Sequence, residues 1–158
     1  MLEKCNNAKE RWGGVSDLID GWLEHRQKLI SLFMTLPNTE VKVLEEKVGN
    51  FCALMMDYLS SGHFEVYEQL LREGSEFNDG GLEKAQTLFP LIQPTTDAAL
   101  DFNDDYGSFS SPTVQEIREF SFQLSKLGEN LEERFSLEDQ LIEILHTAHR
   151  DQVMTEEA

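Results

Sequence analysis

An apolar stripe from Val114 to Leu145 is the feature of this sequence that most constrains its fold. Apolar residues recur there at steps of three and four, which is the period of one helix face. A helix over this stretch spans about 50 Å at 1.5 Å per residue. Ser111 and Pro112 precede it and predict an N-cap followed by proline at the first helical position. The stripe consists of Val114, Ile117, Phe120, Leu124, Leu127, Leu131, Phe135, Ile142 and Leu145.

Two further segments with the same period precede the middle of the chain. The first runs from about Asn7 to Thr35; Gly13-Gly14 weakens its start, and Pro37-Asn38 stops it. The second runs from about Thr39 to Ser60, and Asn38 is its predicted N-cap. Ser60-Ser61-Gly62 then predicts a helix end or a kink, because the helical pattern resumes directly afterwards.

A third segment lies between Asn78 and Tyr106, and it contains two prolines. Pro90 and Pro94 each remove a backbone donor, so they predict a break or kink. No strand-like alternation competes with the helical pattern. The sequence therefore predicts an all-α fold: an antiparallel up-and-down helical bundle with four main long helices, some kinked or broken. We expect one domain over residues 1–150 and a frayed acidic tail over residues 151–158.

The charge balance limits the partners of such a bundle. Thirty acidic residues stand against thirteen basic ones, giving a net charge of −17, and residues 77–158 hold seventeen of the acids. This field repels nucleic acid and anionic lipid and favours a basic protein partner, although acidic surfaces also simply keep proteins soluble. Met1–Lys4 is not followed by the pattern of a basic region and an apolar run, so we expect no signal peptide, and no apolar run is long enough to span a membrane. Cys5 and Cys52 have neither C-x-x-C nor zinc spacing, and two scattered cysteines suit a reducing compartment, so we expect a cytoplasmic protein.

Two histidine patterns offer alternatives with chemistry. Glu143 and His146 have the Glu-x-x-His spacing of metal-binding bundles, and His149 follows one turn later. A metal-binding bundle using Glu143, His146 and His149 is therefore the alternative function, although the second Glu-x-x-His of a di-iron site is missing. His25 with Lys28 is a weaker hypothesis for phosphotransfer. No nucleophile or phosphate-loop motif is present, so we expect neither an enzyme nor a bound cofactor.

Two segments combine charged and aromatic side chains. Asp20, Trp22 and Arg26 lie on the first predicted helix, and Asp57–Phe64 spans the predicted break after the second. These segments are either a recognition surface or ordinary core, cap and turn residues. Arg134 and Glu138 lie four residues apart on or beside the apolar stripe of the last helix. We expect them to pair as structural residues, since a lone buried charge is costly.

The same segments resemble the Rsd/AlgQ family of anti-sigma factors. Asp20-Gly21-Trp22-Leu23 followed by Arg26, Asp57-Tyr58-Leu59-Ser60-Ser61-Gly62-His63-Phe64 and Leu131-Glu132-Glu133-Arg134-Phe135-Ser136-Leu137-Glu138-Asp139 are similar to family motifs in the same order. The opening Met1-Leu2-Glu3 and Glu10-Arg11-Trp12-Gly13-Gly14-Val15 resemble the AlgQ branch. Gly21, which replaces an expected basic residue, and the segment Asn103–Ser111 depart from the family pattern.

This resemblance implies a function without catalysis. It implies a bundle, monomeric when free, that binds region 4 of the housekeeping sigma factor one-to-one. Such binding hinders use of the sigma factor with core RNA polymerase and the −35 promoter element, without direct contact to nucleic acid. The matching positions imply partner-binding residues Asp20, Trp22, Arg26, Asp57, Tyr58, His63 and Phe64.

Overall fold

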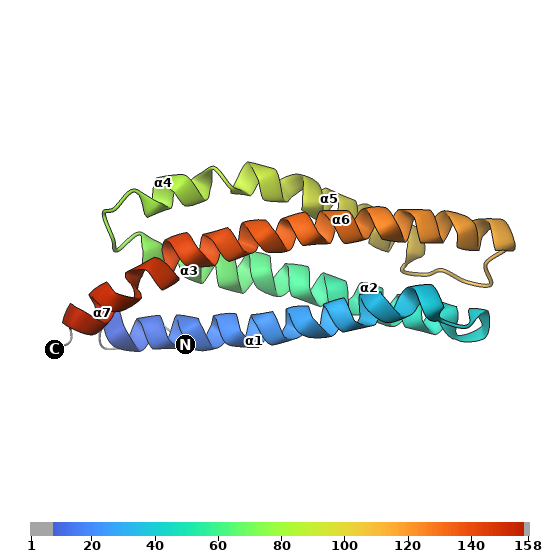
Figure 1. Ribbon diagram of the computed structural model, residues 1–158, viewed down its shortest axis with the longest axis horizontal. Helices are drawn as coiled ribbons and strands as arrows, with labels where there is room; N and C mark the ends of the chain where they lie inside the picture. Colours follow the sequence, from blue (N-terminus) through green and yellow to red (C-terminus); the bar gives the residue numbers. More distant parts are fainter. Residues whose placement is uncertain (1–7, 157–158) are drawn as a thin grey trace.

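The computed structural model describes residues 8–156 as a bundle of helices (Figure 1). The opening Met1–Glu3 segment, Cys5 and residues 157–158 of the predicted tail lie outside this range. The predicted all-α bundle with four main long helices is confirmed. Its elements are α1 (Ala8–Thr35), the 3-10 turn η2 (Leu36–Asn38), α2 (Val41–Ser61), the π-helical turn η3 (Gly62–Val66), α3 (Tyr67–Gly74), α4 (Gly81–Gln86), α5 (Phe89–Tyr106), α6 (Val114–Leu145), the 3-10 turn η4 (Thr147–His149) and α7 (Arg150–Glu156).

Successive helices run back and forth along the bundle axis (Figure 1). The segment α2–η3–α3 returns alongside α1, α5 lies against α2, and α6 packs along α5, α4 and α3. The apolar stripes meet in one continuous core, in which Leu29, Phe51, Met55 and Leu141 are completely buried. The predicted stripes therefore bury themselves against one another, as amphipathic helices require.

The helix boundaries differ from the sequence predictions at several points. α6 takes Thr113 rather than Ser111 as its N-cap, because Thr113 and Glu116 form a reciprocal capping box. The Thr113 hydroxyl accepts from the Glu116 backbone at 3.1 Å, and the Glu116 carboxylate accepts from the Thr113 backbone at 3.2 Å. α2 begins after an extended Glu40, so the prediction of an Asn38 cap is wrong; Asn38 is taken up by the turn η2.

The two prolines of the third segment behave differently from each other. The chain breaks between α4 and α5, and Pro90 sits in the first turn of α5, where its missing donor costs nothing. Pro94 lies inside α5 without ending it. Gly13-Gly14 likewise does not interrupt α1, which is helical throughout.

Residues beyond 150 belong to a short helix in the structure. α7 lies beside the start of α1 (Figure 1), and it buries Val153. The expected domain end at residue 150 and the fraying of the tail in solution stay predictions.

Candidate partner-binding site

Three of the seven predicted contact residues lie inside the bundle. Trp22, Arg26 and Tyr58 are at most 6% exposed, and the Trp22 and Tyr58 rings stack with centroids 4.8 Å apart. The Trp22 indole donates to the Tyr58 carbonyl oxygen at 3.2 Å. The Arg26 guanidinium lies 5.4 Å from the Trp22 ring centroid and 4.7 Å from that of Phe135. The periodicity that puts these residues on helix stripes therefore buries them, because the stripes face the core.

The turn η3 explains why a glycine follows Tyr58 by one helical turn. A Cβ atom on Gly62 would lie only 2.9 Å from Cζ2 of Trp22, so a larger residue would clash with the ring. At the same point the helix takes the wider π-helical turn before continuing as α3. The predicted kink is thus a π-turn within a continuing helix, a feature that often marks functional sites.

Glu138 is the centre of a buried hydrogen-bond network. Its carboxylate is completely buried and accepts from four side chains of α1, α2, α3 and α6. One oxygen accepts from the Tyr58 hydroxyl at 2.5 Å and from Arg26 at 3.3 Å. The other accepts from the Tyr67 hydroxyl and from Arg134 at 3.2 Å. The predicted Arg134–Glu138 pair is confirmed, and it belongs to a larger set that ties the bundle together.

The two guanidiniums each have further acceptors. Arg134 donates to Thr95 at 3.2 Å, to Thr96 at 2.6 Å and to the Tyr67 oxygen at 3.1 Å. Arg26 donates to the Tyr58 oxygen at 2.9 Å and to Asp139 at 2.6 Å. The buried charges are therefore paired and hydrogen-bonded, which burial of charge requires.

This environment shifts the pKa values of its titratable groups. Burial raises the pKa of Glu138, while Arg134, the two phenols and Arg26 oppose that rise. Burial and the neighbouring carboxylate raise the pKa of Tyr58 and of Tyr67 above the ordinary phenol value. Both phenols consequently remain protonated donors over the physiological range.

The other four predicted residues are exposed. Asp20 lies on the outer face of α1, and Asp57 lies on the outer face of α2. Phe64 is 69% exposed, and its ring meets the His63 ring edge-on at 4.8 Å between centroids. Within the described part of the chain, Asp20 and Asp57 carry carboxylates with no hydrogen-bond or ion-pair partner. The structure therefore brings His63 and Phe64 together, and it presents two unpaired carboxylates on neighbouring helices.

A pocket beside His63 connects this exposed surface with the buried network. It has a volume of about 410 Å³ and lies between α3 and α5, where His63, Tyr67, Phe89 and Thr96 are among its lining residues. Tyr67 and Thr96 also bond to Glu138 and Arg134, respectively. A change in the network would therefore affect side chains that line the pocket.

Sequence reasoning missed several members of the network. In the sequence, Tyr67 has the position of an aromatic residue on the apolar stripe. Thr95 and Thr96 have the positions of ordinary helix residues between Pro94 and Asp97. Asp139 lies inside the third family motif, but its position in the sequence does not indicate a partner. The available signal was the pair Arg134 and Glu138 itself: two charges on a buried stripe need polar partners from other helices.

The histidines of the metal-binding alternative do not converge. His146 Nδ1 lies 2.9 Å from a Glu73 oxygen, and His149 Nε2 lies 2.6 Å from an Asp79 oxygen. Glu143 is exposed, whereas both histidines are buried. Residues 8–156 contain no group of three or more side chains arranged to hold a metal ion. The metal-binding hypothesis for Glu143, His146 and His149 is therefore wrong, because each histidine is taken by a separate carboxylate.

His25 does not fit the phosphotransfer hypothesis either. It is half-buried, its Nε2 atom is enclosed, and its ring packs edge-on against Tyr58 at 5.9 Å between centroids. A phosphoryl acceptor nitrogen must reach solvent to meet its donor.

The fold and these surfaces define an all-α bundle whose exposed groups suit protein binding. The chain belongs to the Rsd/AlgQ family: a family model described as "Regulator of RNA polymerase sigma(70) subunit, Rsd/AlgQ" matches residues 1–146. The family predicted from its motifs is confirmed, and it is a family of transcription regulators. None of the helices within residues 8–156 is both long and apolar enough to cross a membrane.

Proteins named "Regulator of sigma D" resemble this chain over almost its full length. The one from Salmonella paratyphi B (strain ATCC BAA-1250 / SPB7) is 35% identical over 157 residues, covering 96% of this chain and 95% of that protein. The one from Pectobacterium carotovorum subsp. carotovorum (strain PC1) is 36% identical over 152 residues, covering 92% of this chain and 99% of that protein.

Proposed function

We propose that this protein is a cytoplasmic anti-sigma factor that binds region 4 of the housekeeping sigma factor one-to-one. Binding there hinders use of the sigma factor with core RNA polymerase and with the −35 promoter element. The observation that carries the proposal is the unpaired Asp57 carboxylate close in sequence to the 69% exposed Phe64 ring, on motifs of a sigma-regulator family. An exposed carboxylate and an exposed aromatic ring suit a partner that offers basic and apolar groups.

The seven predicted residues divide into two roles in this proposal. Asp20, Asp57, His63 and Phe64 contact the partner, because their side chains reach solvent. Trp22, Arg26 and Tyr58 are positioning residues that hold α1 against α2 and η3 from inside. The protein acts by occupying the sigma surface, without catalysis or a cofactor, and is a monomer before binding.

Calorimetric titration with the isolated region 4 domain tests the proposal. We expect one-to-one binding that weakens as salt is raised, because screening reduces attraction between exposed charges. Phe64→Ala should weaken binding by about 2 kcal/mol, since it removes a central aromatic anchor. Asp57→Asn should weaken it by about 1 kcal/mol at low salt.

Asp104→Asn is the matched control, because Asp104 is an exposed carboxylate on α5. Its affinity for region 4 should equal that of the unmodified protein, with the same loss of one charge. Absence of binding at low salt would refute the proposed partner. Equal losses in the Asp57 and Asp104 variants would instead remove Asp57 from the contact surface.

A further inference from the structure

One side of the bundle is less tightly closed than the others. Close backbone contacts join α1 to α2, α2 to α5 and α5 to α6, whereas no comparable contact joins α1 to α6. Side chains cross this seam at the ion pair between Arg26 and Asp139. Two helices that stand apart along a seam leave their facing side chains only partly covered.

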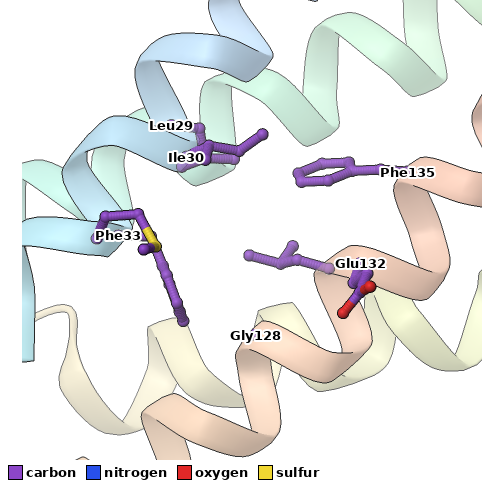
Figure 2. Close-up of a pocket in the computed structure, with 8 residues that line it drawn as sticks. Leu29, Ile30, Phe33, Gly128, Glu132 and Phe135 are labelled. Carbon is purple, nitrogen blue, oxygen red and sulfur yellow. The ribbon is translucent and has the colours of Figure 1, made fainter.

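The open seam contains an apolar groove between α1 and α6. Figure 2 shows Leu29 and Ile30 of α1 facing Phe135 of α6, while Phe33 points toward Gly128 and Glu132 lies beside them. This part has a volume of about 280 Å³; the buried Leu29 lies at its base, and Met34 at its edge is 66% exposed. An adjoining part of about 510 Å³ continues past η2 toward the start of α6. Both parts are lined by Phe33, Gly128 and Glu132, so they form one groove.

Gly128 allows Phe33 to approach the α6 backbone closely within the groove. A Cβ atom there would lie 2.7 Å from Cζ of Phe33, so the ring packs directly on the α6 backbone. Along α6 the groove runs from Ile117 to Phe135. At 1.5 Å per residue this distance is about 27 Å, which equals about eighteen residues of a helix laid alongside.

A stripe of acids borders the groove on α6. Glu129, Glu132, Asp139 and Glu143 are all exposed, and with Ser136 they follow one another at steps of three and four. This spacing puts them on one helix face, next to the apolar lining. Asp139 is paired with Arg26, whereas Glu129, Glu132 and Glu143 have no ion-pair partner among residues 8–156.

We propose that the groove between α1 and α6 binds an amphipathic helix of a partner protein, with its apolar side in the groove and its lysines or arginines on the acidic stripe. Neither Asp57 nor Phe64 lines this groove, so the inference does not depend on the identity of the sigma contact. An apolar floor with one charged border is the pattern that accepts such a helix. The negative charge of the border favours a positively charged helix.

The same charge argues against two other occupants. A second copy of this chain would set one acidic stripe near another, between molecules that each carry a net charge of −17. An anionic membrane surface would meet the same repulsion. A basic helix removes the repulsion and covers the apolar lining at the same time.

The probe for the test is a fluorescent helical peptide of about eighteen residues, built of leucine and lysine with one apolar face. A scrambled peptide of the same composition lacks that face. We expect the full-length protein to bind the first at least about tenfold more tightly, because the scramble retains charge but cannot fill the groove. Fluorescence anisotropy measures both affinities.

Two groove variants and one control locate the binding. Met34→Ser removes an exposed apolar contact without disturbing the core, and Glu129→Gln with Glu132→Gln neutralises the border. Each should weaken peptide binding several-fold, with a loss of up to about tenfold in affinity. Asp101→Asn with Asp104→Asn removes the same charge from α5 and should leave the affinity unchanged.

Three results would overturn the inference. Equal weakening by the α6 and α5 double variants would show attraction to overall charge rather than to the groove. Concentration-dependent dimers of the unmodified protein that Met34→Ser dissociates would make a second copy the occupant. Loss of region 4 binding in the Met34 and Glu129/Glu132 variants would make the groove part of the sigma contact instead of a separate surface. Region 4 binding that persists in these variants, together with lost peptide binding, supports the proposal.

Discussion

Replacing Glu138 by glutamine tests how strongly the buried network stabilises the bundle. Glutamine keeps the shape of the side chain but replaces one carboxylate oxygen with an NH2 group. That group must face either the Tyr58 and Arg26 donors or the Tyr67 and Arg134 donors. A guanidinium cannot accept a hydrogen bond, so one arginine meets a donor where it had an acceptor. The substitution also leaves the completely buried Arg134 without its closest anionic partner.

The expected loss is large for a chain of this size. Removing one partner of a buried ion pair costs about 3–5 kcal/mol, because the remaining charge stays buried and uncompensated. For a protein of this length, each kcal/mol lowers the melting temperature by about 2–4 °C. Glu138→Gln should therefore unfold about 6–20 °C earlier than the unmodified protein, with helical content retained at low temperature.

Urea unfolding followed by circular dichroism and tryptophan fluorescence measures the loss of unfolding free energy, and thermal unfolding measures the shift in melting temperature. Glu133→Gln is the matched control: Glu133 is exposed on the same helix, and its replacement should change stability by less than about 0.5 kcal/mol. Arg134→Met completes a double-mutant cycle, in which the double variant should lose about 1–3 kcal/mol less than the sum of the single losses. A Glu138→Gln loss no larger than that of Glu133→Gln would refute a stabilising role for the network.

Three further perturbations probe its surroundings. The free energy of unfolding should fall as pH rises above the ordinary phenol pKa of about 10, because Tyr58 and Tyr67 release protons there in the unfolded chain but not in the folded one. Tyr58→Phe should reduce the slope of that fall by about 1.4 kcal/mol per pH unit. Gly62→Ala should cost about 1–3 kcal/mol in urea unfolding, because its new Cβ meets the Trp22 ring. Thr113→Ala should cost about 1 kcal/mol by the same measurement, because it removes the α6 capping box.

The fold was largely predictable because helical periodicity is a local property. The stripe from Val114 to Leu145 sets the length of α6 without reference to any other segment. Helix starts were less predictable, because neighbouring residues compete for the same role. Ser111 and Thr113 both qualify as caps, and only Thr113 has a glutamate three residues later to complete the box.

The candidate site was harder to predict than the fold, because its parts come together only in three dimensions. Glu138 bonds to Tyr58 and Tyr67 across 80 and 71 positions of sequence, and no spacing rule connects residues so far apart. The groove was missed for the same reason. Its lining comes from the facing sides of α1 and α6. The apolar pattern of either helix alone does not predict how far apart the two helices lie.

The motif Asp57–Phe64 shows why a family motif should not be equated with a contact surface. Successive residues of a helix point about 100° apart, so Asp57 and Tyr58 cannot both face a partner. The structure buries Tyr58 completely and exposes Asp57. A motif of this kind combines two requirements: one residue keeps the helices in register from inside, and its neighbour meets the partner outside. Substitution of Tyr58 should therefore change stability and binding together, whereas substitution of Asp57 should change binding alone.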